Sequence, residues 1–213
     1  MPASVIFLIS DDAPQTASND NHIRLPEAFT KGNWSVHIGA PERLTLTPEG
    51  LVVDDFALHE ADLIWPLGFG PRSGFLDRAH LLRQLPQEKL ISPMAEHVLG
   101  HGKAQWSEYC PPTYVSNDPD YLQEIAHEYA GDWVLKPLAG SYGRDVHHVQ
   151  ANQCAIIDDI MLEQPGSYFA LQRYVAGILE GEIRTLVAGG QIIGSYRQLP
   201  GRTHLLLSPA QIL

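Results

Sequence analysis

Lys136 stands at the end of a short apolar stretch and directly before a loop that is rich in glycine. The stretch, Trp133–Leu135, has the residues of a half-buried strand, which Pro137 should end because it cannot donate a hydrogen bond within a sheet. Gly140 and Gly143 permit positive φ angles and a close approach of the backbone to a ligand. A lysine fixed on a strand and facing a loop of N–H donors suits a polyphosphate ligand.

The loop itself, Gly140-Ser141-Tyr142-Gly143, fits neither of the common glycine-rich fingerprints. The chain contains no G-x-x-x-x-G-K-[ST] motif of a P-loop and no G-x-G-x-x-G motif of a dinucleotide-binding domain. Taken alone, the loop is a turn. The phosphate interpretation therefore depends on Lys136 and on polar residues elsewhere in the chain.

Three further groups of residues, most of them polar, follow a consistent order along the chain. Taken singly, each has a simpler explanation: a solvated lysine, a strand end, a charged turn or a surface arginine. Among these residues, lysines can act as point charges and arginines as bidentate forks for phosphate oxygens. The groups are Lys103; Gln172, Arg173, Tyr174 and Val175; and Glu182, Arg184 and Arg197.

The elements that must position these residues fall into two parts. In residues 1–93, apolar strand patterns alternate with helical patterns, which predicts βαβ units and a parallel sheet. Ser4–Ile9 is a continuous apolar run with β-branched residues, typical of a strand buried on both faces. The other expected elements here are strands Trp34–Gly39 and Ala61–Leu67, helices His22–Lys31 and Phe75–Leu85, and a small hairpin of Leu44–Leu46 with Leu51–Val53.

Residues 94–213 follow a different pattern. A helix is expected over Ala95–Trp106, and a second over Pro119–Tyr129 with Asp118 as its N-cap. Gly189-Gly190, between two apolar runs, predicts a β-hairpin. Ile156–Leu162 is apolar and fits either a helix or a strand. The predicted domains are therefore 1–93 and 94–213.

Composition excludes several classes of protein. The net charge of −11 and the pI near 5.2 argue against a nonspecific nucleic-acid binder, which needs a basic face. No segment reaches the ~18 apolar residues of a membrane span, and the N-terminus lacks a basic signal-peptide region. We expect a cytoplasmic protein whose phosphate site is built from local cations.

In their order and spacing these motifs resemble the ATP-grasp superfamily and, within it, prokaryotic glutathione synthetase. The resemblance covers nearly the whole chain and is strongest from Lys103 to Arg197. It implies an α/β protein with a Rossmann-like N-terminal domain followed by a partial ATP-grasp (α+β) fold. It also implies ATP as cofactor, together with small amino-acid or peptide substrates.

The resemblance assigns a role to each candidate residue. Lys103 and Lys136 correspond to the lysines that hold the ATP phosphates, and Gly140–Gly143 to the mobile loop that closes over them. Gln172–Val175 is similar to the hinge whose backbone holds adenine. Glu182, rather than Glu180, corresponds to the acid that bonds the ribose. Arg184 and Arg197 correspond to catalytic arginines that face the phosphates or an acyl phosphate.

The family's magnesium ligands, two acids and an asparagine, are expected beyond Arg197. The sequence has no Asp or Glu after Glu182 and no Asn after Asn152, so no metal ligand is assigned. We expect a C-terminally truncated chain whose apolar tail leaves part of a sheet exposed. Three interpretations stay open: a carboxylate–amine ligase of the glutathione-synthetase type, a catalytically dead nucleotide-binding or interaction module, and a homodimer that completes the site in trans.

Overall fold

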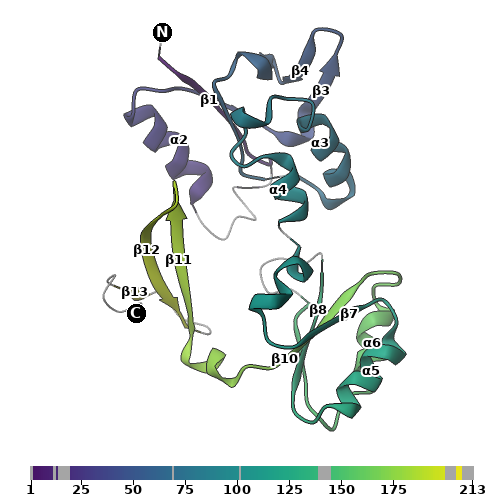
Figure 1. Cartoon of the computed structure of the whole chain (residues 1–213). Coiled ribbons are helices and arrows are strands. Elements are labelled where there is room, and N and C mark those ends of the chain that lie inside the picture. The colour runs from purple at the N-terminus through teal and green to yellow at the C-terminus, as the bar shows by residue number, and fades with distance from the viewer. Residues whose placement is uncertain are drawn as a thin grey trace. The chain divides into compact units, whose positions relative to one another are not determined.

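The computed structural model describes residues 2–11, 13, 20–68, 70–100, 102–138 and 145–199, and the backbone of residues 205–207; the side chain of Arg72 is not described. The chain divides into two compact units, Met1–Gln105 and Trp106–Leu213 (Figure 1). The domain boundary after residue 93 stays a prediction. The loop Gly140–Gly143 lies outside the described residues.

The first unit is organised around a parallel sheet of three strands in the order β2-β1-β6. β1 is Ser4–Leu8, β2 is Ser35–Gly39 and β6 is Leu63–Pro66. Helix α2, Asn21–Lys31, connects β1 to β2. The βαβ arrangement predicted for this part of the chain is confirmed.

β1 is the most deeply buried strand of this sheet, as its continuous apolar sequence predicted. Ile6 and Leu8 pack on one face, in a cluster that includes Leu82 of helix α3 (Phe75–Leu82). Phe7 points to the other face, where its ring lies 5.4 Å from that of Phe29 in α2. Burial on both faces is what a run without polar alternation requires.

The rest of the first unit consists of short elements. Gly100 and Gly102 divide the helix that we expected over Ala95–Trp106, so the second half of that helix is a 3₁₀ segment. The strands are β3 (Leu44–Thr47), β4 (Gly50–Val53) and β5 (Phe56–Ala57), and the helices are α3 (Phe75–Leu82) and α4 (Met94–Leu99). The 3₁₀ segments are η1 (Pro41–Arg43), η2 (Leu58–Glu60), η3 (Arg72–Gly74), η4 (Gln87–Lys89) and η5 (Lys103–Tyr109), the last of which continues into the second unit.

The second unit contains a four-stranded sheet in the order β7-β10-β8-β9, paired antiparallel throughout. The strands are β7 (Thr113–Ser116), β10 (Phe169–Arg173), β8 (Trp133–Pro137) and β9 (His147–Val149). β8 extends through Pro137, two residues beyond the predicted strand.

Helices α5 (Pro119–Glu128) and α6 (Ile156–Leu162) cover one face of this sheet (Figure 1). Trp133, Leu135 and Phe169 point to that face and are buried in a cluster with both helices. The Asp118 side chain accepts from the Asp120 N–H at 3.1 Å, which confirms the predicted N-cap. Because side chains alternate along a strand, the residues between the buried ones point to the opposite face.

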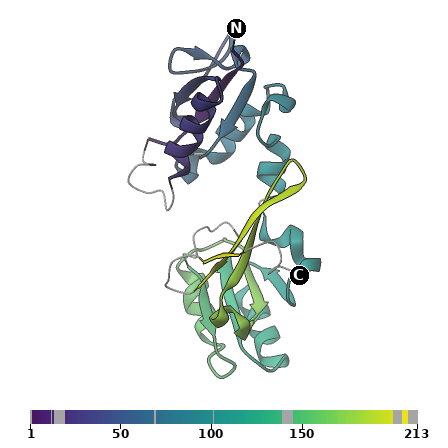
Figure 2. The same ribbon diagram turned by 90° about the vertical axis from the view of Figure 1, so that its left-hand side faces the viewer.

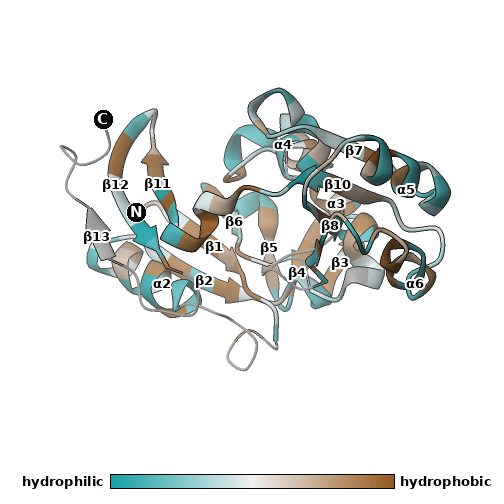
Figure 3. Ribbon diagram, turned by 90° about the horizontal axis from the view of Figure 1, so that it is seen from below, coloured by the Kyte–Doolittle hydropathy of each residue, from teal (hydrophilic) through white to brown (hydrophobic). Residues whose placement is uncertain are grey.

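The last strands form a second antiparallel sheet, β11-β12-β13, which begins with a long curved hairpin (yellow-green in Figure 2). The elements are β11 (Glu182–Ala188), β12 (Gln191–Gln198) and β13 (Leu205–Leu207), and η6 (Ala176–Glu180) precedes them. The β-hairpin predicted around Gly189-Gly190 is confirmed. Hydrophobic residues occur on both β11 and β12 (brown in Figure 3), and those with exposed side chains are Ile183, Leu186, Val187, Ile192 and Ile193.

Candidate functional site

Lys136 lies on β8 and points to the face of the sheet opposite α5 and α6. Its neighbours Leu135 and Pro137 are buried, whereas Lys136 is half-buried. The Lys136 Nζ donates to the Gln172 Oε1 at 2.8 Å, across to the adjacent strand β10. Two residues that were assigned separately from the sequence, 36 positions apart, therefore lie in direct contact.

The Gln172 side chain continues this contact to a third strand. Its Nε2 donates to the Thr113 Oγ1 at 2.8 Å, and the Thr113 hydroxyl donates to the Pro111 carbonyl at 2.7 Å. A line of hydrogen bonds thus crosses β8, β10 and β7 on one face. The bond to Gln172 uses one of the donors of the Lys136 ammonium, and its other N–H groups can donate to phosphate oxygens.

The segment after Gln172 was predicted to bind adenine through its backbone. The N–H of Arg173 donates to the Pro112 carbonyl at 2.9 Å, and that of Tyr174 to the Asp132 carbonyl at 3.0 Å. Within the described ranges, the Val175 N–H donates to no backbone carbonyl, and the residue is exposed. A donor left open at the end of a strand is what an adenine ring nitrogen requires.

The side chains of this segment have structural partners instead. The Arg173 guanidinium lies 3.9 Å from the centre of the Trp133 ring, and its NH1 donates to the Ala130 carbonyl at 2.8 Å. Trp133 faces α5 and α6, so Arg173 points away from the Lys136 face. The ring of Tyr174 stacks on His148 with 4.3 Å between centroids.

Glu182 and Arg184 lie on the same face of β11 and form an ion pair. The Arg184 Nε donates to the Glu182 Oε1 at 2.7 Å. The Tyr196 hydroxyl and then the Glu182 carboxylate raise the pKa of Arg184 above its ordinary value, so the guanidinium stays charged. This face can present both a hydrogen-bond acceptor and a fixed cation to a ligand.

Arg197 lies on the face of the hairpin opposite Arg184, and the catalytic role expected for both arginines stays a prediction. In the register of the hairpin, Arg197 pairs with Ile183, and Arg184 pairs with Tyr196. Neighbouring residues point to opposite faces of a sheet, so the two arginines diverge. The Arg197 NH1 lies 3.5 Å from the Glu180 carbonyl.

Gln198 is the residue that faces Glu182 across the hairpin, and sequence reasoning missed it. Its Oε1 is buried and accepts no hydrogen bond from a described group. The sequence does not indicate this pairing, because the register of the hairpin shifts at a bulge between Leu186 and Val187. A regular hairpin on the Gly189-Gly190 turn would pair Glu182 with Arg197, and the bulge shifts this pairing by one residue.

Lys103 begins the 3₁₀ segment η5 and is half-buried within the first unit. The other described candidates belong to the second unit. The joint phosphate contact assigned to Lys103 and Lys136 therefore stays a prediction, as do the roles of Ser141 and Tyr142, which lie outside the described residues.

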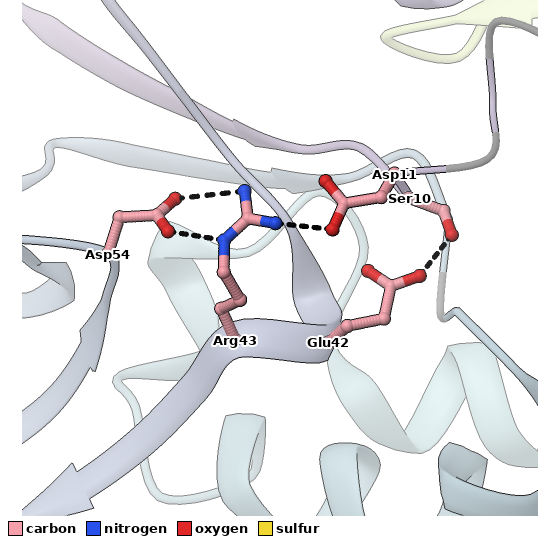
Figure 4. Close-up of polar contacts among 5 residues, drawn as sticks. All are labelled: Ser10, Asp11, Glu42, Arg43 and Asp54. Carbon is pink, nitrogen blue, oxygen red and sulfur yellow. Dashed lines mark hydrogen bonds and ion pairs between the residues drawn. The ribbon is translucent and has the colours of Figure 1, made fainter.

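A separate polar cluster lies where β1 ends in the first unit (Figure 4). Arg43 bridges Asp11 and Asp54, and the Ser10 hydroxyl donates to Glu42. Both carboxylates raise the pKa of Arg43. These bonds tie the segment after β1 to the residues after β2 and β4, so we assign the cluster a structural role.

No group of three or more His, Cys, Asp or Glu side chains within the described ranges could hold a metal ion. No helix in the same part of the chain is long and apolar enough to cross a membrane.

In a comparison with known protein families, residues 102–205 match the ATP-grasp domain of prokaryotic glutathione synthetase. A glutathione synthetase of Parasynechococcus marenigrum (strain WH8102) is 29% identical over 195 residues, which cover 86% of this chain and 58% of that protein. One of Brucella melitensis biotype 1 is 27% identical over 137 residues, which cover 61% of this chain and 43% of that protein. The chain thus spans about half the length of these curated relatives.

Solved structures show the same fold at lower identity. A RimK domain ATP-grasp protein from Sphaerobacter thermophilus has a TM-score of 0.69 and 19% identity, over 93% of this chain and 74% of that chain. The D-cycloserine synthetase DcsG also has a TM-score of 0.69, with 16% identity, over 92% of this chain and 68% of that chain. At this level of sequence identity, the similarity shows a shared fold and nothing more.

Proposed function

This chain has a partial ATP-grasp fold and resembles prokaryotic glutathione synthetase, and on that premise we propose that it is an ATP-dependent carboxylate–amine ligase. In the glutathione-synthetase type of reaction, a carboxylate is activated as an acyl phosphate and an amine then attacks it. The substrates of the proposed reaction are small amino acids or peptides.

The contact between Lys136 and Gln172 is the observation that carries this proposal. It brings a cation and the first residue of the predicted adenine hinge to neighbouring positions on one face of the sheet. A nucleotide whose adenine meets the Val175 N–H and whose phosphates meet Lys136 would lie across that face. The donor set, an ammonium and an open backbone N–H, fits ATP.

ATP would supply the phosphoryl group, and the chain's own residues would bind and orient it. Lys136 neutralises phosphate charge, while the phosphate contacts assigned to Lys103 and to Gly140–Gly143 stay predictions from the sequence. Glu182 accepts from the ribose hydroxyls. Arg184, on the same face as Glu182, stabilises negative charge on the transferred group.

Magnesium has no fitted site among the described residues, because no cluster of acidic or other metal-ligating side chains is present there. We therefore derive no step through the metal. A nucleotide-binding module without ligase activity is the main alternative, and a site completed by a second copy of the chain is another. Both make predictions that differ from those of a self-sufficient ligase.

The test combines binding and turnover on the 213-residue chain. Titration calorimetry with ATP, with and without magnesium, measures binding; a coupled assay measures ADP release with a γ-glutamyl dipeptide and glycine. A ligase binds Mg-ATP and releases ADP only when both substrates are present. ATP binding without ADP release from any pair of amino acids would establish the binding module instead.

Light scattering at micromolar concentration tests the third interpretation. Completion of the site in trans requires a dimer under the conditions in which ADP is released. A monomer that turns over would exclude it, whereas activity that rises with dimer concentration would support it.

A further inference from the structure

The Thr113 hydroxyl determines which way the Gln172 amide points. It donates its single hydrogen to the Pro111 carbonyl at 2.7 Å, so only its lone pairs face Gln172. The amide must therefore turn its Nε2 toward Thr113, at 2.8 Å. This turns the Gln172 Oε1, the acceptor, toward the Lys136 ammonium.

The reverse amide orientation would set two donors against each other. The Gln172 Nε2 would then face the Lys136 Nζ, and neither group accepts a hydrogen bond. Lys136 would lose its partner, and its flexible stem would be free to take other rotamers before a ligand arrives. A lysine side chain loses rotamer entropy when it is fixed, so holding it in advance favours binding.

We propose that Thr113 is a positioning residue of the nucleotide site, which acts through Gln172 to hold Lys136 ready for the ATP phosphates. The inference rests on the proposed function, since it takes Lys136 as a phosphate ligand. It adds a residue from β7, a strand on which the motifs place no functional group. The proposed role of Thr113 requires no contact with the nucleotide.

The Thr113→Val variant removes the hydroxyl and keeps a β-branched side chain that suits a strand. Without the hydroxyl, the Gln172 Nε2 loses its acceptor, and only the Lys136 ammonium still holds the amide in place. We expect ATP to bind about tenfold more weakly, because Gln172 loses the bond that anchors it and so holds Lys136 less firmly before ATP arrives. Adenosine, which has no phosphate, should bind with less than about a twofold change.

Thr113→Ser keeps the hydroxyl and should restore ATP affinity to within about twofold of wild type. Thr45→Val is a matched control in the first unit, because the Thr45 hydroxyl also donates to a carbonyl two residues earlier, that of Arg43 at 3.3 Å. It should change neither affinity. Thermal unfolding of each variant shows whether the fold is kept.

A double-mutant cycle supplies a second, independent readout. Gln172→Met breaks the line between Thr113 and Lys136, so Thr113→Val should have no further effect on ATP affinity in that background. Additive losses would overturn the proposal.

The affinities can be measured by titration with ATP and by competition of adenosine against a fluorescent ATP analogue. Equal weakening of ATP and adenosine in Thr113→Val would assign Thr113 a purely structural role and overturn the proposal. So would unchanged ATP affinity. A wild-type chain that binds no ATP would instead refute the proposed function, which keeps the two failures distinct.

Discussion

Arg184 and Arg197 lie on opposite faces of one β-hairpin. The first pairs with Tyr196 and the second with Ile183, so their side chains diverge. Only Arg184 shares a face with Glu182. The two arginines, equivalent by sequence, therefore make separable predictions.

Arg184→Met should slow ADP release by about a hundredfold, because a cation aimed at developing negative charge is lost. Arg197→Met should slow it by less than about threefold, because its side chain points to the other face. Steady-state kinetics on both variants checks this. The reverse ranking would show that the ligand lies on the Arg197 face of the hairpin.

Gln172→Glu places a carboxylate against the Lys136 ammonium and so neutralises the charge offered to phosphate. We expect ATP to bind about thirtyfold more weakly, while adenosine affinity changes little. Competition binding with both ligands measures the difference. A variant that binds ATP as tightly as wild type would place Lys136 outside the phosphate site.

Arg173→Leu should destabilise the second unit and spare the nucleotide site. The guanidinium covers the Trp133 ring and donates to the Ala130 carbonyl, contacts worth about 1–2 kcal/mol together. Urea unfolding measures this loss. If ATP affinity fell sharply while stability stayed at the wild-type value, the Arg173 side chain would belong to the site.

Cys154 should resist alkylation in the folded protein, whereas Cys110 should react. Cys154 is buried, and its burial raises the pKa of the thiol above the ordinary value of 9.0. The protonated Cys154 thiol therefore contributes to stability below the pKa that the thiol has in the unfolded chain. This contribution declines as the pH rises through the higher pKa that the thiol has in the folded chain. Labelling with iodoacetamide at pH 8 tests the order, and rapid labelling of Cys154 before unfolding would contradict the fold around α6.

Local sequence patterns predicted most elements of the fold because they act over a few residues. The apolar run of β1 requires burial on both faces. Asp118 caps the N-terminus of α5, and Pro119 occupies its first turn. Ile156–Leu162 could not be assigned, since a short apolar run suits a helix or a strand equally. The structure shows that it is a helix.

The contacts within the site could not be predicted in the same way. Lys136 and Gln172 were both selected from the sequence, but their contact depends on the pairing of β8 with β10. Thr113 was missed because its role appears only when β7 is paired on the far side of β10. The bulge that replaces Arg197 by Gln198 opposite Glu182 leaves no recognisable pattern in the sequence.

We propose that Lys136 binds the phosphates of ATP on the face of the sheet opposite α5 and α6. Calorimetric titration of ATP into wild type, Lys136→Met and the exposed-lysine control Lys31→Met tests it most directly. We expect Lys136→Met to bind ATP at least about a hundredfold more weakly, and Lys31→Met to bind it as wild type does. Equal ATP affinity in wild type and Lys136→Met would contradict it.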